Sequence, residues 1–257
     1  MGLYKKQIAD GVRLSCLETD KFKTNFLSFN FIAPLEAGCA AKNALIPAIL
    51  MRGSKKYPTM ADLSKKLDYL YASGLSGRNY KRGETQVFGL CAGMIDSSYA
   101  IGGEDIISEV TDLLCEVLLN PATDRQAFDA AYTESEKSNL IDTINANINN
   151  KAYYAYLRCI EEMCKNERFG LSENGTVGDV SSCTPESVFA QYKYALEKYP
   201  IEIFFVGRCD FDKLSEKFTR LLAGLKRDPI EIPPTEIIRS AASVRSVTED
   251  MPVNQGK

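Results

Sequence analysis

The 257-residue sequence contains no histidine. This absence excludes Ser-His-Asp triads, Cys-His dyads, histidine-ligated zinc and histidine general bases. Any chemistry would have to use carboxylates, lysine, tyrosine or cysteine. The sequence also lacks an apolar run of about 18 to 20 residues, the length that spans a bilayer. We therefore expect neither histidine-based catalysis nor a bilayer-spanning helix.

A CxxC pattern is absent too, and the N-terminal residues MGLYKKQIADGVRL lack the apolar core of a signal peptide. Without such a segment, the expected location is the cytoplasm, where scattered cysteines are mostly small buried residues. Cys159 and Cys164 are five residues apart on a predicted helix and point in different directions, so we expect no metal site there. The eight cysteines are Cys16, Cys39, Cys91, Cys115, Cys159, Cys164, Cys183 and Cys209.

No strong charge imbalance or long run of one sign is present. The net charge is −3, from 31 basic and 34 acidic residues. This balance favours neither nucleic acid nor an anionic membrane surface as a partner. A hydrophobic fraction of 45% and a charged fraction of 25% are typical of a folded globular protein. The length allows one large domain or two small ones.

The order of predicted elements mixes strands and helices without strict alternation. Alternating apolar residues, as in TNFLSFNFIA, predict half-buried strands, and apolar residues at helical spacing predict amphipathic helices. Hairpins are also expected, which favours an α+β fold: a largely antiparallel, mixed sheet with helices packed on one face. The predicted strands are 12–18, 24–33, 73–81, 84–95 and 201–206, and the predicted helices are 43–52, 60–72, 104–119, 125–166 with a break near 147–150, 184–196 and 211–222.

Two capping signals set the expected starts of helices. Gly38 and the Lys42-Asn43 pair indicate a loop, with Asn43 as the N-cap of the next helix and Gly53 as its C-cap. In this frame Pro47 falls at the edge of the first turn, where proline is tolerated, so the helix is expected to begin late or to bend. Later in the chain, Thr184 followed by proline is a start signal of the same kind.

The last part of the chain differs in composition from the rest. Residues 226–257 contain Asp228-Pro229, Pro233-Pro234 and Pro252, with few apolar residues. We predict an α+β domain over residues 1–225, followed by a linker over residues 226–257 in which a second, similar domain begins. On this reading the sequence is a fragment of a longer protein.

Six segments, in order, resemble the insulinase-type (M16) metallopeptidase family. The most informative is ALIPAILMRGSKKYP at residues 44–58, which is similar to the family segment that carries HxxEH in active members. The others are GVRLSCLET, LDYLYASGLSGRNYKRGET, EVLLNPATDRQAF, GTVGDVSSCTPESVFAQYK and IFFVGRCDF, and PVNQGK resembles the hinge before a second domain. The resemblance implies the M16 domain fold and extends over nearly the whole chain.

The zinc motif of that family is missing here. Aligned on Arg52-Gly53, the first histidine position is Ala44, the catalytic glutamate position is Pro47 and the second histidine position is Ala48. The third ligand, normally a glutamate, falls near Ser138, with Glu134 and Glu136 close by. A catalytic zinc needs three protein ligands and a base for its water, and these residues supply neither. We therefore predict a non-catalytic relative without metal or cofactor.

The resemblance also implies partners. Bacterial M16 proteins can work as pairs in which only one subunit carries HxxEH, so we expect a cytoplasmic heterodimer that processes peptides. A peptide would bind by strand addition at an exposed edge. The alternative is an edge strand without a binding role, which Arg78 and Lys81 protect from pairing with other chains. The candidate edge residues are Ser73, Gly74, Leu75, Ser76, Gly77, Arg78, Asn79 and Tyr80.

Two further functions stay open at this point. The chain could form a homodimeric peptide-binding scaffold without a protease partner, which the sequence does not separate from the heterodimer. It could also be a divergent, zinc-independent hydrolase that uses one of two charged clusters, although such clusters are more often solvated helix faces. The clusters are Glu134, Glu136 and Lys137, and Glu104, Asp105 and Glu109.

Overall fold

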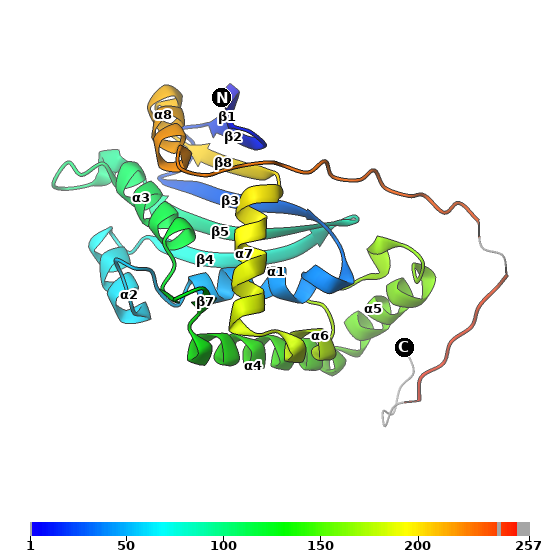
Figure 1. Ribbon diagram of the computed structural model, residues 1–257. Coiled ribbons are helices and arrows are strands. Elements are labelled where there is room, and N and C mark those ends of the chain that lie inside the picture. Colours follow the sequence, from blue (N-terminus) through cyan, green and yellow to red (C-terminus); the bar gives the residue numbers. More distant parts are fainter. Residues whose placement is uncertain (1, 241–242, 251–257) are drawn as a thin grey trace.

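A computed structural model describes residues 2–240 and 243–250. Its centre is a six-stranded sheet in the order β1-β2-β8-β3-β5-β4, in which only β2 and β8 run parallel (Figure 1). This arrangement confirms the predicted α+β class with a largely antiparallel sheet. The strands are β1 Gly2–Ala9, β2 Val12–Glu18, β3 Thr24–Pro34, β4 Gly74–Arg82, β5 Thr85–Ile95 and β8 Ile201–Gly207.

Helices α1, α7, α3 and α8 pack on one face of this sheet (Figure 1). Most of them begin at a polar cap, as the Thr184 signal predicts: the Thr184 side chain accepts a hydrogen bond from the N–H of Ser187. The helices are α1 Ala37–Leu50, α2 Met60–Tyr69, α3 Ile106–Leu119, α4 Ala130–Ala146, α5 Lys151–Met163, α6 Val177–Ser182, α7 Pro185–Lys198 and α8 Phe211–Leu222. Shorter elements are the β6–β7 hairpin (Thr123–Asp124 and Ala127–Phe128) and the 3-10 turns Ser97–Tyr99, Asn147–Asn149 and Arg168–Gly170.

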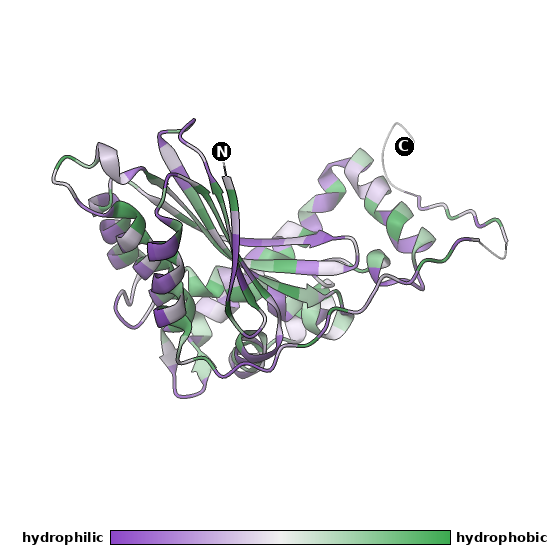
Figure 2. Cartoon of the chain, turned by 90° about the horizontal axis from the view of Figure 1, so that it is seen from above, coloured by the Kyte–Doolittle hydropathy of each residue, from purple (hydrophilic) through white to green (hydrophobic). Residues whose placement is uncertain are grey.

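The hydrophobic core lies between the sheet and these helices. Alternate residues of β3, Leu27, Phe29 and Phe31, are fully buried and point toward the helices. Phe31 stacks on Phe88 of β5, with ring centroids 5.2 Å apart. Seen from above, hydrophobic segments alternate with polar ones along the strands (Figure 2). Five of the eight cysteines are buried, which confirms that most of them are core residues.

Strand β1 was not predicted from the sequence. Its residues GLYKKQIA are mostly exposed, and the strand lies at the edge of the sheet, where it pairs only with β2. The β1–β2 connection turns at Gly11, which has a φ of +63°, a conformation that favours glycine. Lysine-rich edge strands carry little hydrophobic signal, so only the pairing with β2 identifies this one.

The segment after α8 remains packed on the domain as far as Ile230. The Arg227 guanidinium donates hydrogen bonds to the carbonyls of Leu196 and Tyr199 at the end of α7 and to Asp10 in the first turn of the chain. The N–H of Ile230 bonds the Lys198 carbonyl. Farther on, Arg245 and Glu249 reach α5 through Glu162 and Arg158. Residues 252–257, where we predict a second domain to begin, lie outside the described residues.

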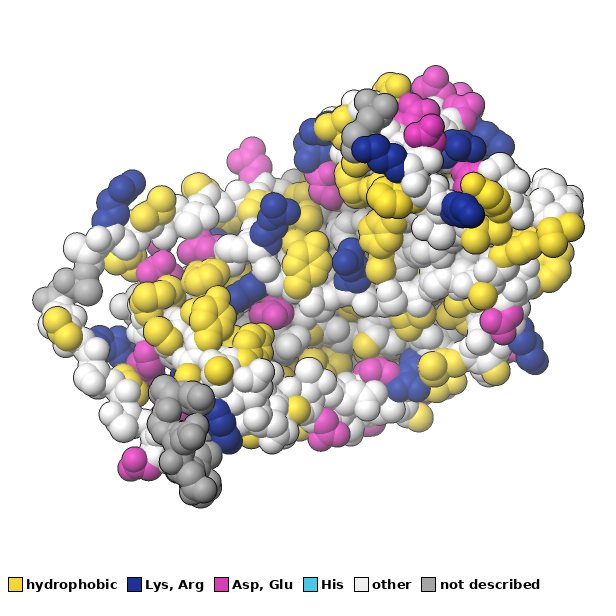
Figure 3. All heavy atoms as spheres, turned by 180° about the vertical axis from the view of Figure 1, so that it is seen from behind, with side chains coloured by type: hydrophobic (Ala, Val, Ile, Leu, Met, Phe, Trp, Pro, Cys, Tyr) yellow, Lys and Arg dark blue, Asp and Glu magenta, His cyan; other side chains and the backbone are white. Residues whose placement is uncertain are grey.

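The face of the sheet opposite α1 and α7 has a different character. Figure 3 views the molecule from behind, where hydrophobic and charged side chains are scattered among other side chains and backbone. Small and polar residues of the central strands point to this side, among them Ser28, Asn30, Gly89 and Cys91. Across residues 2–240 and 243–250, no helix is both long and apolar enough to cross a membrane.

Candidate functional site

Helix α1 contains Ala44, Pro47 and Ala48, the three positions at which we predict the zinc motif to be lost. It begins at Ala37, so the predicted loop at 38–43 and the predicted Asn43 cap are wrong; the residue before the helix is Glu36, whose side chain makes no capping bond. Pro47 therefore lies well inside the helix. Ala44 and Pro47 are buried and Ala48 is half-buried. The helix keeps the packing of a central element and offers no donor atom at these positions.

Asn43 lies inside α1, where its side chain belongs to a buried polar network. The Asn43 amide nitrogen donates to Gln86 Oε1 on β5 at 2.9 Å, and Gln191 of α7 donates to Asn43 Oδ1 at 2.8 Å. Gln191 also donates to the Tyr199 hydroxyl at 3.0 Å. Asn43 and Gln86 are completely buried. The amide of Asn43 therefore joins α1 to β5 and α7 instead of capping a helix, a role that local sequence cannot indicate.

The same network reaches strand β4 and the loop before α6. Gln86 Nε2 lies 2.9 Å from Asn79 Oδ1, 2.7 Å from the Glu173 carbonyl and 3.0 Å from the Ala40 carbonyl. Asn79 in turn donates to Asn174 at 2.9 Å. One glutamine thus fixes the first turns of α1 relative to the edge of the sheet.

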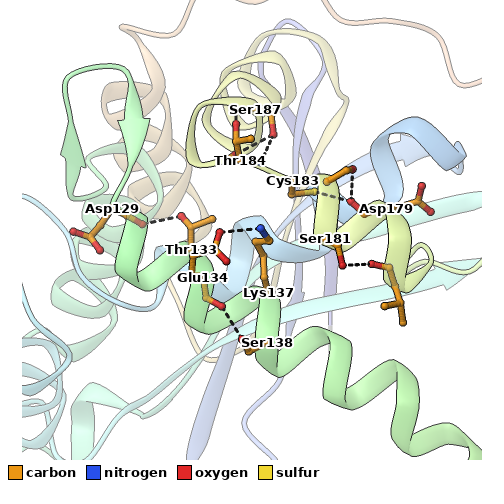
Figure 4. Close-up of polar contacts among 12 residues, drawn as sticks. Asp129, Thr133, Glu134, Lys137, Ser138, Asp179, Ser181, Cys183, Thr184 and Ser187 are labelled. Carbon is orange, nitrogen blue, oxygen red and sulfur yellow. Dashed lines mark hydrogen bonds and ion pairs between the residues drawn. The ribbon is translucent and has the colours of Figure 1, made fainter.

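Helix α4 contacts α1 and carries Ser138, near which we predict the third-ligand position. Ser138 is exposed, and its hydroxyl donates to the Glu134 carbonyl within its own helix (Figure 4). Glu136 faces α1 but is engaged: Arg52 donates to its carboxylate and to the Ser135 hydroxyl. The side chain of Lys137, only 12% exposed, pairs with Glu134 at 2.8 Å. Glu134 and Glu136 of α4 are therefore each paired with a cation of the chain itself.

The electrostatics between α1, α4 and α6 also oppose a metal cation. Burial raises the pKa of the Cys183 thiol, and the positive charges of Lys42 and Lys137 act in the opposite direction. The Cys183 thiol donates to the Asp179 carbonyl (Figure 4). Within the described residues no group of three or more His, Cys, Asp and Glu side chains could hold a metal ion. The residues present do not fit the zinc of an M16 peptidase.

The second charged cluster is built into the fold. Asp105 caps α3 by accepting from the N–H of Ser108, and it pairs with Lys213 of α8 at 2.6 Å. Glu109 pairs with Lys66 of α2 at 2.7 Å. Glu104 accepts a hydrogen bond from the Tyr71 hydroxyl. Each carboxylate has a structural partner, and the three do not converge on a shared space.

Strand β4 is the free edge of the sheet on the side of α1. The N–H of Leu35 bonds the carbonyl of Glu84, directly opposite, so the even-numbered residues of β5 bond β3 and its odd-numbered residues bond β4. By this alternation the backbone groups of four β4 residues point away from the sheet. No described segment supplies a backbone partner to them. They are Leu75, Gly77, Asn79 and Lys81.

Ser73 lies outside this strand. Its N–H bonds the carbonyls of Leu67 and Leu70, and its side chain is buried in the turn after α2. The two charged side chains expected to protect the edge contact other parts of the chain. Lys81 donates to the carbonyls of Phe169 and Leu171, and the Arg78 guanidinium lies over the Phe26 ring on the back of the sheet. The edge of β4 is therefore open along Gly74–Arg78, and it runs directly over α1, where Gly77 contacts Pro47.

The chain is similar to known proteins in sequence and in structure. No family model matches the chain. The sequence is 33% identical over 204 residues to the probable inactive metalloprotease YmfF of Bacillus subtilis, covering 79% of this chain and 48% of that protein. This similarity agrees with the prediction of a non-catalytic relative.

Solved structures share the fold. A conserved protein from Enterococcus faecalis superimposes with a TM-score of 0.84 at 23% identity, over 93% of this chain and 56% of that one. A peptidase M16 inactive domain from Pseudomonas fluorescens gives a TM-score of 0.69 at 14% identity, over 92% of this chain and 54% of that one. The chain spans about half the length of the relatives it matches.

Proposed function

We propose that this chain, which has the M16 peptidase-like fold and a sequence similar to that of a probable inactive metalloprotease, is the non-catalytic member of a pair of such proteins. In this proposal the partner carries HxxEH and performs the hydrolysis. The present chain helps to bind the peptide and to enclose it. The observation that carries the proposal is helix α1, which keeps its buried position while every zinc-binding and proton-accepting group is absent.

The preserved packing supports a binding role. Leu45, Ile46, Ile49 and Leu50 of α1 are buried in the core, so the helix is held as firmly as a core element. Beside it, the β4 edge offers unpaired backbone donors and acceptors in an extended array. An extended peptide can add to such an edge through its own backbone. A rigid helix under an open strand is therefore suited to binding a peptide without cleaving it.

The pairing is tested with the full-length protein and an HxxEH-bearing relative from the same genome. We expect a one-to-one complex on size-exclusion chromatography with light scattering, and peptidase activity at least about tenfold above that of the relative alone. Chelation of zinc should abolish this activity. The proposal fails if the two proteins elute separately and activity is unchanged. A stable homodimer without a partner would favour the scaffold alternative.

Peptide binding at β4 has its own test. An unstructured fluorescent peptide is compared with two copies that are N-methylated at alternate residues, in opposite register. Strand addition requires N–H groups on one side of the peptide only, so one copy should lose affinity at least about tenfold and the other should retain it. Equal binding of all three peptides would show that the backbone is not recognised. A random-sequence peptide of equal charge serves as the control.

A further inference from the structure

Two cysteines far apart in the sequence meet inside the fold. Cys16 on β2 and Cys209 after β8 have their sulfur atoms 3.4 Å apart. Among the described residues no other cysteine pair makes a sulfur–sulfur contact. Cys16 is fully buried, whereas Cys209 is half-buried and borders the core. The pair therefore joins a concealed thiol to one that solvent can reach.

The backbone turn that returns Cys209 to Cys16 is fixed by its neighbours. Strand β8 ends at Gly207, opposite Glu18, and the chain must reverse to bring residue 209 back. Gly207 has a φ of +142°, and a side chain there would collide with Asn25 Oδ1, 1.9 Å from the ideal Cβ position. Asn25 Oδ1 also accepts a hydrogen bond from the N–H of Arg208 at 2.9 Å. The approach of the two sulfurs is thus a consequence of a specific turn.

The surroundings of the pair keep it in place from the other side as well. Asp210, the next residue after Cys209, caps α8 by accepting from the N–H of Lys213. Phe211 of α8 stacks on Tyr4 of β1, with ring centroids 5.5 Å apart. Cys16 is paired with Tyr4 on one side and Phe205 on the other. Three strands and the start of α8 therefore hold the two thiols together.

We propose that Cys16 and Cys209 form a reversible intramolecular disulfide when the protein meets a peroxide. The pair first loses one proton, and the remaining proton can pass between the two sulfurs in contact. The half-buried Cys209 sulfur then attacks one oxygen of hydrogen peroxide, so that an S–O bond forms, the O–O bond breaks and hydroxide leaves. The Cys16 sulfur then attacks the sulfenic sulfur, forming the S–S bond and releasing a second hydroxide. The two thiol protons convert both hydroxides to water, so two thiols are oxidised and one peroxide is reduced.

The contact also favours the chemistry. The hydrogen bond between the thiols lowers the pKa of Cys16, against the opposing effects of burial and of Glu18, and it raises the pKa of Cys209, together with burial. The shared proton eases the first ionisation of the pair, and a thiolate is the form that reacts. A native disulfide has sulfurs about 2.05 Å apart, so closure needs only a small movement. The bond would tie β2 to the β8–α8 turn across 193 residues of sequence.

The test uses the whole chain, reduced and then treated with a small molar excess of hydrogen peroxide. After denaturation and alkylation with N-ethylmaleimide, the oxidised protein should carry two fewer adducts than the reduced one. Peptide mapping should recover Cys16 linked to Cys209, and dithiothreitol should reverse the change. Because the cross-link closes a long loop, we expect a Tm higher by roughly 5 to 10 °C.

Two variants distinguish this pair from general thiol oxidation. C209S should keep all its remaining thiols free after the same treatment, whereas C159S, which removes an exposed cysteine outside the pair, should still lose two. The mapping of the unmodified protein decides the matter even if C209S folds poorly. Full alkylation after peroxide, a disulfide between other cysteines or between chains, or a sulfinic acid at Cys209 without a cross-link would each refute the proposal.

Discussion

Gly77 of strand β4 lies against Pro47 of helix α1 with no room for a side chain between them. A Cβ atom at Gly77 would be 2.9 Å from Pro47 Cβ and 3.2 Å from both the carbonyl carbon and oxygen of Pro47. Two of these atoms belong to the helix backbone, so a change of rotamer cannot relieve the contact. The candidate peptide edge therefore lies against Pro47, the position that we predict to correspond to the catalytic glutamate of active relatives.

We expect Gly77→Ala to destabilise the protein by about 1–3 kcal/mol, because the strand or the helix must move to admit the methyl group. Chemical denaturation followed by circular dichroism measures this difference. Gly74→Ala is the matched control, since a Cβ there meets nothing within 4 Å on the same strand. Equal stabilities for the two variants would contradict the close approach.

The buried amide network gives a second prediction. Gln86→Leu removes the acceptor of the Asn43 amide and the donor to the Ala40 carbonyl, and it leaves these buried polar groups unsatisfied. We therefore expect a loss of about 2–4 kcal/mol. Gln7→Leu, an exposed glutamine in strand β1, should change the free energy of unfolding by less than about 0.5 kcal/mol. A loss no larger in Gln86→Leu than in this control would mean that the network contributes little.

Amide hydrogen exchange tests the free edge of β4. In the protein alone, the N–H groups of Leu75, Gly77 and Asn79 should exchange quickly, whereas those of Ser76 and Arg78, bonded to β5, should be protected. A peptide that adds as a strand should slow exchange at the first set only. Uniform protection along the strand before any peptide is added would indicate that the edge is already covered.

Acid should weaken a contact at the end of β5. Burial opposes ionisation of Asp96, but hydrogen bonds from Ser98 and Asn25 and the charge of Arg208 outweigh it, so the pKa of Asp96 is lowered. A carboxylate with a lowered pKa stabilises the folded state above its unfolded pKa, about 4, and this contribution is lost as pH falls through the folded value.

Asp96→Asn should accordingly lower Tm at pH 7, and the difference from the unmodified protein should shrink below about pH 4. Thermal unfolding from pH 7 to pH 3 measures it. Asp20→Asn, at an exposed position in the β2–β3 turn, is the control and should leave Tm unchanged across this range. A difference in Tm between the variant and the unmodified protein that stays constant with pH would show that the substitution acts through packing and not through ionisation of Asp96.

Zinc should have no specific effect on the chain. After dialysis against zinc and then against buffer, elemental analysis should find well below one zinc per protein, and a chelator should leave Tm unchanged. The reason is the donor set: Ala44, Pro47 and Ala48 offer no ligand atom, and Glu136 is bound by Arg52. Stoichiometric zinc that survives dialysis would overturn the non-catalytic assignment.

Much of the fold follows from local patterns in the sequence. The central strands and the long helices carry strong periodicity, and Thr184 marks the start of α7 where the structure places it. Local patterns do not predict strand β1 or the start of α1. Strand β1 is identified only by its pairing with β2, and the start of α1 depends on contacts with residues distant in sequence. Asn43 has the residue type of a cap, yet tertiary hydrogen bonds to Gln86 and Gln191 override that local preference.

The sequence by itself determines what this chain lacks: without histidine, no rearrangement of its 257 residues can build a zinc site with histidine ligands. Only the tertiary structure decides which groups meet. The open edge of β4 over Pro47 and the approach of Cys16 to Cys209 arise from strand order and from one glycine turn. Composition fixes the available atoms, whereas contacts between distant residues depend on packing that local sequence does not encode.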